Sequence, residues 1–270
     1  MNMKEENVTI GAKGTEYGNW MSMASIKMVG GITTILAIAF VIVLLMAQGV
    51  IWKIILGVLT LAGVLLLIDV LRIRKALSYD GGKTMDLMQR NLMERLDWDG
   101  KGTALDVGCG SGTVTIRAAK TYPEAKIVGI DNWGIGWDYS KELCEKNAKL
   151  EGVADRCEFK HGSAVKLDFP DETFDALIAS CVYTQIMGKK GGMKNLISES
   201  LRTLKKGSPF VIQDYFEREK IFGSKDELLQ YLKDTGVSEV HYQGGLDSML
   251  PRVVIRPYCI KGTAIIWGRK

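Results

Sequence analysis

The sequence has few of the residues that bind metals or form disulfides. Its 270 residues include two histidines, His161 and His241, and five cysteines, an odd number with no Cys-x-x-Cys pair. Neither histidine has a cysteine, aspartate or histidine partner at ligand spacing, so metal chemistry finds no support. A scattered, odd set of thiols also argues against a disulfide framework or a zinc site. We therefore expect no metal centre and reduced, cytosolic thiols.

Charge of one sign is also scarce. The formal net charge is only +4, from 35 Lys and Arg against 31 Asp and Glu, and the basic residues are scattered among acidic ones. A nucleic-acid-binding protein usually gathers its basic residues into a patch or stripe. The composition therefore argues against nucleic acid as a main partner.

Apolar residues, by contrast, are concentrated in one region. Residues 28–52 carry no charge, and residues 54–71 carry only Asp69. A helix of about 20 apolar residues crosses a bilayer core of about 30 Å, so we expect two membrane spans, with Gly49 and Lys53 at the turn. The apolar region begins too late and runs too long for a signal peptide. A buried soluble hairpin is disfavoured because neither segment has a polar face.

Flanking charges predict the orientation of these two spans. Lys27 precedes the first, a basic cluster at residues 72–75 follows the second, and only Lys53 lies in the turn. Basic residues favour the cytoplasmic side, so we expect a multi-pass protein of the cell membrane with both termini and the C-terminal domain cytoplasmic. The predicted divisions are an N-terminal cytosolic or interfacial segment (1–27), a transmembrane hairpin (28–75) and a globular domain (76–270). Residues 14–27 form either an interfacial leader or a lid over the site.

A glycine-rich loop follows the first predicted strand of the globular region. A short strand expected to be buried, 104–107, leads into Gly108, Gly110 and Gly112, and a helix is expected from about Thr113. A strand, a glycine turn and a helix N-terminus together let a ligand approach bare backbone. The third glycine comes one position too early for the dinucleotide fingerprint G-x-G-x-x-G. A second predicted strand, 125–131, ends in a carboxylate that suits a ribose diol.

The motif D-x-G-x-G-x-G at residues 106–112, with an acidic residue closing the next strand, resembles class I S-adenosylmethionine-dependent methyltransferases. The resemblance covers about residues 79–268 and includes "GSAVKLDFPDETFDALIAS" (162–180) and "LISESLRTLKKGSPFVIQDYF" (196–216). It implies an α/β fold with a Rossmann-like, doubly wound sheet of seven strands. It also implies S-adenosylmethionine as the cofactor and methyltransferase activity.

The same resemblance implies a set of cofactor-binding residues. The glycine loop would surround the methionine part of the cofactor, Asp131 would hold the ribose hydroxyls, and Ser163 and Ala164 would lie beside adenine. Many family members carry Asp where Ser163 stands. Trp133 would either cover adenine or pack as a core indole under the sheet. The full set comprises Asp106, Gly108, Cys109, Gly110, Gly112, Asp131, Asn132, Trp133, Ser163, Ala164 and Cys181.

Methyl transfer by this family is an in-line displacement, so alignment of two bound partners can supply roughly 7–11 kcal/mol of the acceleration and a strong base is optional. The predicted catalytic residues, Asp214 and Tyr183, lie with Tyr215 near the expected carboxyl ends of the fourth and fifth strands. Asp214 is preferred, because a carboxylate ending an apolar strand must face solvent or a site. Cys181 is a further candidate or a buried small hydrophobe. A membrane tether favours a small or lipophilic acceptor. The alternatives are a non-catalytic cofactor-binding membrane sensor or scaffold and a nicotinamide-dependent reductase.

Overall fold

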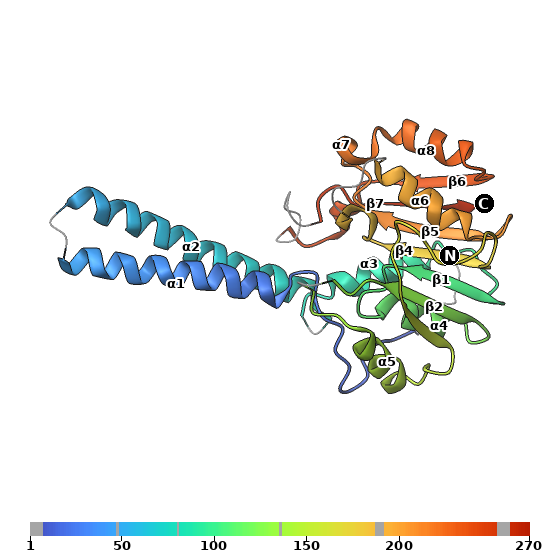
Figure 1. Ribbon diagram of the computed structural model, residues 1–270, viewed down its shortest axis with the longest axis horizontal. Helices are drawn as coiled ribbons and strands as arrows, with labels where there is room; N and C mark the ends of the chain where they lie inside the picture. Colours follow the sequence, from blue (N-terminus) through green and yellow to red (C-terminus); the bar gives the residue numbers. More distant parts are fainter. Residues whose placement is uncertain (1–7, 47–48, 80, 135–136, 187–191, 253–259) are drawn as a thin grey trace. The chain divides into compact units, whose positions relative to one another are not determined.

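The structure is a computed structural model that describes residues 8–46, 49–79, 81–134, 137–186, 192–252 and 260–270. The chain divides into two compact units (Figure 1). One comprises residues 18–84 and 134–138, and the other comprises residues 1–17, 85–133 and 139–270. The first unit holds the apolar helices and the second holds the sheet.

The apolar region forms two helices, α1 (Met23–Met46) and α2 (Val50–Leu77). Both are long and apolar enough to cross a membrane, and little of either apolar window is buried. The expected boundary was wrong, because α1 ends before Trp52 and both Trp52 and Lys53 lie in the first turn of α2. Gly49 has extended backbone at the start of α2, a break that the absence of charge over residues 28–52 does not reveal. Residues 47–48 lie outside the described residues.

Small residues bring α1 and α2 close together. A Cβ on Gly63 would lie 2.8 Å from Thr33 Oγ1, and a Cβ on Gly57 would lie 3.2 Å from the Phe40 ring. The Thr33 hydroxyl donates to the Val29 carbonyl at 2.8 Å, so its polar atom is satisfied within α1. Close approach through small residues is typical of helices that pair in membranes.

The second unit contains a seven-stranded sheet in the order β3-β2-β1-β4-β5-β7-β6. β7 runs antiparallel to β5 and β6, while the pairs among β1 to β5 are parallel. The predicted α/β class and seven-stranded, doubly wound sheet are confirmed. The strands are β1 (Thr103–Val107), β2 (Lys126–Asp131), β3 (Cys157–His161), β4 (Ala176–Ser180), β5 (Pro209–Asp214), β6 (Glu239–Gln243) and β7 (Ala264–Arg269).

Alternating residues of the strands bury both faces of this sheet. Leu105 and Leu177 join a core with Leu196 and Leu228 from the helices on one face, while Asp106 points to the other face and accepts from Thr115 of α4. The helices are α3 (Thr84–Met93), α4 (Thr113–Thr121), α5 (Lys141–Leu150), α6 (Gly192–Arg202), α7 (Glu219–Phe222) and α8 (Lys225–Asp234), with short 3-10 turns η1 (Tyr183–Gln185) and η2 (Leu246–Met249). Strand order reverses between β1 and β4, where such sheets form a ligand crevice at their carboxyl ends.

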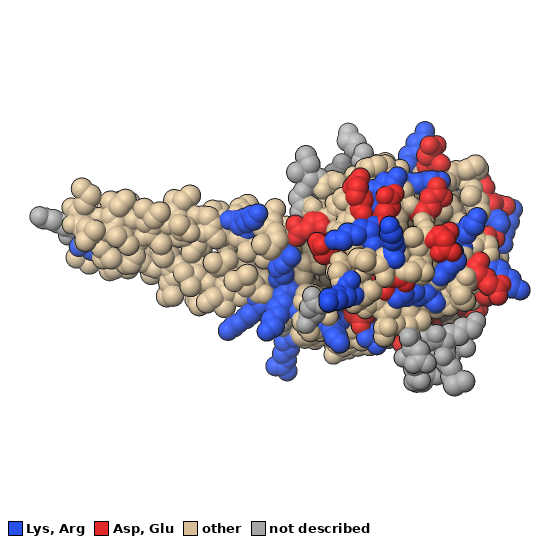
Figure 2. Space-filling view, turned by 90° about the horizontal axis from the view of Figure 1, so that it is seen from below, with Lys and Arg blue, Asp and Glu red and all other residues tan. Residues whose placement is uncertain are grey.

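Charges of both signs are interspersed over the face of the globular unit seen in Figure 2. The surface of the helical hairpin in the same view is mostly uncharged. Its exposed side chains include Ile35, Leu45 and Val58. An exposed apolar surface of this extent marks contact with a membrane or with another protein.

Candidate functional site

The glycine loop lies at the carboxyl end of β1, beside the point where strand order reverses. Gly108, Gly110 and Gly112 have φ of 72°, 55° and 79°, a left-handed conformation that favours glycine. A Cβ on Gly108 would lie only 2.2 Å from Val182 Cγ2. The loop therefore packs directly against the segment that follows β4, and a side chain at position 108 has no room there.

Asp131 and Trp133, at the end of β2, hold the loop in place. The Gly110 N–H donates to Asp131 Oδ2 at 2.9 Å, and the Trp133 N–H donates to Asp131 Oδ1 at 2.8 Å. The Trp133 indole N–H donates to the Gly110 carbonyl at 2.8 Å. The structure thus brings the predicted glycine motif and the predicted ribose carboxylate into direct contact.

The placement of Trp133 does not fit a core indole under the sheet. The residue has φ of 42°, is half-buried, and packs edge-on against His161 with ring centroids 4.8 Å apart. Its indole is bonded to the loop that precedes α4. Trp133 therefore shapes the rim of the candidate site, and a role over adenine stays a prediction.

Asp106 is a buried carboxylate on β1, just before the loop. Its side chain accepts from Thr115 Oγ1 at 2.6 Å, and the residue is 1% exposed. Burial raises the pKa of Asp106 to about 7, with the Thr115 hydrogen bond opposing and the negative charge of Asp131 adding to the shift. A strongly shifted carboxyl group beside a crevice is typical of functional sites.

The predicted adenine segment begins next to Asp131, since the Gly162 N–H donates to the Asp131 carbonyl at 3.0 Å. Ser163 is exposed and accepts from the Val165 N–H at 3.3 Å, and Asn132 is exposed at the same edge. Ala164, by contrast, belongs to the hydrophobic core. Only the backbone of Ala164 could therefore face a cofactor without displacing core side chains.

Asp214 ends β5 as a fully buried carboxylate that is already engaged. It accepts from the N–H groups of Tyr183, Thr184 and Tyr215 at 2.9, 3.3 and 2.8 Å, and also from the Thr184 hydroxyl. Burial raises its pKa, and these hydrogen bonds oppose that rise. Asp214 thus clamps the segment after β4 to β5, and this geometry favours a positioning role over proton transfer.

The expectation of a catalytic Tyr183 does not fit its placement. Its side chain is fully buried, and its hydroxyl donates to Ser200 Oγ of α6 at 2.9 Å, within the core. Burial also raises the pKa of this phenol above its usual range. Cys181, which precedes it, is buried with φ of 53°, and burial raises the pKa of its thiol. The sequence could not show that Tyr183 faces α6, because that depends on the turn after β4.

Two further residues contact the loop from α5. Cys144 Sγ lies 3.1 Å from the Gly110 carbonyl, and Asn147 Nδ2 donates to the Ser111 carbonyl at 3.3 Å. They are three positions apart, so they share one helix face, and both are fully buried. The sequence signal for this contact is an asparagine among the lysines and glutamates of α5, and its burial is visible only in the structure. Thr115, the hydrogen-bond partner of Asp106, was likewise not among the predicted site residues.

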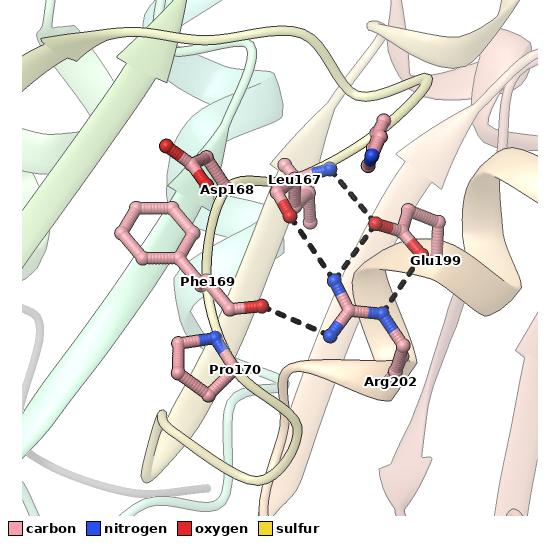
Figure 3. Close-up of a pocket in the computed structure, with 7 residues that line it drawn as sticks. Leu167, Asp168, Phe169, Pro170, Glu199 and Arg202 are labelled. Carbon is pink, nitrogen blue, oxygen red and sulfur yellow. Dashed lines mark hydrogen bonds and ion pairs between the residues drawn. The ribbon is translucent and has the colours of Figure 1, made fainter.

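A pocket of mixed polar and apolar lining lies at the opposite, amino-terminal edge of the sheet, where α6 ends and the loop before β4 turns (Figure 3). Arg202 donates to the Phe169 and Leu167 carbonyls at 2.9 and 3.1 Å and pairs with Glu199, which in turn accepts from the Leu167 N–H at 2.8 Å. The pocket is lined by Lys166, Leu167, Asp168, Phe169, Pro170, Glu199 and Arg202. Arg202 and Glu199 are engaged with each other and with the backbone of this loop, which indicates a structural clamp.

Among the residues that the structure describes, no cluster of three or more His, Cys, Asp or Glu side chains could hold a metal ion. The candidate site therefore offers backbone amides, two carboxylates and an indole. Such a set can bind a cationic or hydroxyl-bearing organic ligand.

Comparison with known proteins identifies the family. A family model described as "Methyltransferase domain" matches residues 99–243. The sterol 24-C-methyltransferase of Yarrowia lipolytica is 31% identical over 113 residues, which are 41% of this chain and 27% of that protein. The ubiquinone/menaquinone biosynthesis C-methyltransferase of Geobacter sulfurreducens is 29% identical over 131 residues, 47% of each chain. The chain thus spans less than half of the length of these relatives.

A solved structure shows the same fold. The geranyl diphosphate C-methyltransferase from Streptomyces coelicolor, in complex with Mg²⁺, geranyl diphosphate and S-adenosyl-L-homocysteine, aligns with a TM-score of 0.53 at 14% identity, covering 70% of this chain and 80% of that one. The cyclase SpnF also aligns with a TM-score of 0.53, at 22% identity and over 70% and 82% of the two chains. Because the family match spans more than half of its length, this chain belongs to the methyltransferase-domain family.

Proposed function

We propose that this protein is an S-adenosylmethionine-dependent methyltransferase, anchored in the cell membrane by α1 and α2, that methylates a small or lipophilic acceptor. The observation that carries the proposal is the bonding of the glycine loop to Asp131 and Trp133 within a chain of the methyltransferase family. When bound, the cofactor supplies an electrophilic methyl group on its sulfonium. The protein supplies alignment, which can dominate such a displacement.

The residues present fit this cofactor. The three left-handed glycines leave backbone that a ligand can approach, and the half-buried Asp131 has carboxylate lone pairs beyond its two backbone bonds. Asp106 would face the positively charged methionine part, and Asp131 the ribose hydroxyls. Cys109, Asn132, Trp133, Ser163 and Cys181 complete the proposed surroundings. Asp214 and Tyr183 are not assigned a proton-transfer step, since their polar atoms are committed to other contacts.

A lipophilic acceptor is supported by two independent features. The described hairpin exposes apolar side chains along both helices, which suits a bilayer, and the basic residues at its flanks suit cytoplasmic termini. The two relatives named above carry sterol and quinone-biosynthesis names. The geometry gives no support to a nicotinamide reductase or to a nucleic-acid partner, and a cofactor-binding sensor stays the main alternative.

Two buried polar side chains mark the proposed acceptor side. Among the described residues, both amide atoms of Gln213, which is fully buried, and the Ser180 hydroxyl have no hydrogen-bond partner of good geometry. The strand registers pair Ser180 with Gln213 and Asp106 with Ile178, so Ser180 and Gln213 point to the face of Asp106, one repeat nearer the crevice. The polar group beside both side chains is the Cys181 thiol, which is only a weak hydrogen-bonding group. We propose that a neutral hydrogen-bonding group of the acceptor satisfies them.

The test is methyl transfer by the full-length protein in membranes. Wild type is incubated with S-adenosylmethionine carrying a labelled methyl group and a total lipid extract, and labelled products and S-adenosylhomocysteine are followed by mass spectrometry. We expect both to form together. Cofactor binding without either product would favour the sensor, and NADH binding without S-adenosylmethionine binding would favour the reductase.

Gln213→Met serves as the acceptor-side variant in the same assay. It keeps the side-chain length and removes the unbonded amide, so we expect unchanged or higher stability, unchanged affinity for S-adenosylhomocysteine and reduced labelling. Equal labelling by wild type and variant would remove Gln213 from the acceptor site.

The raised pKa of Asp106 predicts a pH-dependent affinity for the cofactor. At a pH below its pKa of about 7 this carboxyl group is mostly protonated. Attraction of a cation requires the ionised form. Affinity for S-adenosylmethionine should therefore fall by up to about tenfold per pH unit as the pH drops below 7, measured by calorimetry between about pH 6 and 8.

The matched controls are Asp106→Asn and S-adenosylhomocysteine, which lacks the sulfonium charge. The affinity of the variant should not change with pH, and the affinity for the uncharged thioether should change less steeply than that for S-adenosylmethionine.

In the ligand-free protein the raised pKa of Asp106 favours folding at low pH, and that contribution to stability is lost as the pH rises through about 7. If affinity for S-adenosylmethionine depends on pH in the same way in wild type and in Asp106→Asn, the proposed role of Asp106 is contradicted.

A further inference from the structure

The first described residues, Val8–Tyr17, pack on α4 and α5, the two helices behind the glycine loop. We call this segment the strap. From α4, Lys120 Nζ donates to the Thr9 carbonyl at 2.9 Å, and Arg117 Nη1 donates to the Val8 carbonyl at 3.4 Å. The contacts therefore hold the strap by its backbone, over a sequence separation of more than a hundred residues.

Glu151, at the end of α5, anchors the strap. Its Oε1 accepts from the Gly11 N–H at 2.5 Å, the Ala12 N–H at 2.9 Å and the Tyr17 hydroxyl at 2.6 Å, and its Oε2 accepts from Lys120. Its side chain is only 1% exposed. Burial alone would raise the pKa of Glu151, but the Lys120 and strap donors lower it to about 2. The anchor is therefore charged at neutral pH, and its attachment weakens only as the pH falls from about 4.5 towards about 2.

Asn147, one turn before Glu151, connects the strap to the glycine loop. Its Oδ1 accepts from the Glu16 N–H at 2.9 Å, and its Nδ2 donates to the Glu16 carbonyl at 2.9 Å and to the Ser111 carbonyl at 3.3 Å. Ser111 stands between Gly110 and Gly112. The Asn147 amide thus pairs with the strap backbone through both of its polar atoms while it holds the loop through the second N–H.

We propose that Asn147 is a positioning residue of the cofactor site and that docking of the strap and binding of the cofactor stabilise each other through it. The inference rests on the proposed function. An amide paired with Glu16 is fixed in orientation, and without the strap it is free to rotate away from Ser111. The loop then has to be ordered when the cofactor binds, which weakens binding. Because such coupling is reciprocal, the cofactor must also hold the strap more firmly.

The first measurement is the affinity of the full chain in detergent for S-adenosylhomocysteine, by calorimetry. Asn147→Ala should weaken binding by about fivefold or more, the lower end of typical couplings between sites. Tyr17→Phe, which removes one anchor bond and leaves the core and Asn147 intact, should weaken it by a smaller factor. Lys149→Ala, on an exposed position of the same helix, is the matched control and should bind like wild type.

The second measurement is hydrogen exchange of the strap amides of Gly11, Ala12 and Glu16 with and without S-adenosylhomocysteine. The ligand should slow their exchange in wild type and have no such effect in Asn147→Ala. A merely structural contact would change the melting temperature but not this response to ligand. Tyr17→Phe keeps the test decisive should Asn147→Ala fail to fold.

Two results would overturn the inference. One is an affinity within about twofold of wild type in both Asn147→Ala and Tyr17→Phe, well below typical coupling between sites. The other is strap exchange that ignores the ligand. A wild type that binds no S-adenosylhomocysteine would remove the proposed function together with the inference, whereas a wild type that binds it with an unresponsive strap would remove the inference alone.

Discussion

Gly108→Ala is expected to weaken binding of S-adenosylhomocysteine by at least about tenfold. The residue has φ of +72°, and its new Cβ would lie 2.2 Å from Val182 Cγ2 and 2.6 Å from Val182 Cβ. A left-handed non-glycine residue costs about 1–2 kcal/mol, and overpacking a buried site costs about 1–3 kcal/mol more. Either the loop moves and binds the ligand less well, or the domain loses stability. Because about 1.4 kcal/mol is a factor of ten in affinity, the first outcome corresponds to at least about a tenfold weaker binding. Calorimetry and thermal unfolding together separate these outcomes.

Gly152→Ala is the matched control for Gly108→Ala. Gly152 has the same φ of +72°, and a Cβ there meets no atom within 4 Å. This control carries the backbone strain without the steric clash, so the difference between the two variants reports the contact with Val182. Val182→Gly combined with Gly108→Ala removes the Val182 atoms that the new Cβ would meet, so it should restore part of the affinity. Wild-type affinity in Gly108→Ala would show that the cofactor does not use this loop.

Asp131→Ala is expected to weaken binding of S-adenosylhomocysteine by more than about 1 kcal/mol, because it leaves hydrogen-bond donors without an acceptor. It removes the acceptors of the Gly110 and Trp133 N–H groups, at 2.9 and 2.8 Å, and those proposed for the ribose hydroxyls. The variant should also lose methyl transfer, which makes it the inactive control for the labelling assay. Calorimetry with S-adenosylhomocysteine measures the effect.

Asp131→Asn separates the two parts of this role. Asparagine keeps the size and one oxygen acceptor, but its amide nitrogen meets an N–H donor, so the variant should fall between wild type and Asp131→Ala. An unchanged dissociation constant in Asp131→Ala would mean that the ribose site is elsewhere. Loss of affinity in Asp131→Ala together with wild-type affinity in Asp131→Asn would mean that shape rather than charge matters at this position.

Local patterns in the sequence were sufficient for the sheet and for the glycine loop. Strand 104–107, the glycines and a carboxylate at the end of β2 are close in sequence, and their arrangement depends on short connections that pair neighbouring strands. The apolar run was likewise readable as two helices. Its internal boundary was not, because the prediction relied on the absence of charge before Lys53, whereas the break depends on the backbone of Gly49.

The roles of individual polar side chains depended on partners distant in sequence. Asp214 and Tyr183 were natural candidates at the ends of strands, yet their partners, Thr184 and Ser200, commit them to the fold. Sequence position alone cannot show which hydrogen bonds are already made, because burial and competing donors decide that.

The sequence by itself therefore determined the apolar hairpin, the order of strand, glycine loop and helix, and the chemistry available at the loop, since each depends on residues within a few positions of one another. The tertiary structure alone decided that the loop is held by Asp131, Cys144 and Asn147. It also decided that residues 8–17 pack behind that loop through Glu151. These contacts join segments up to 140 residues apart, and only a folded backbone brings such donors and acceptors within hydrogen-bonding distance.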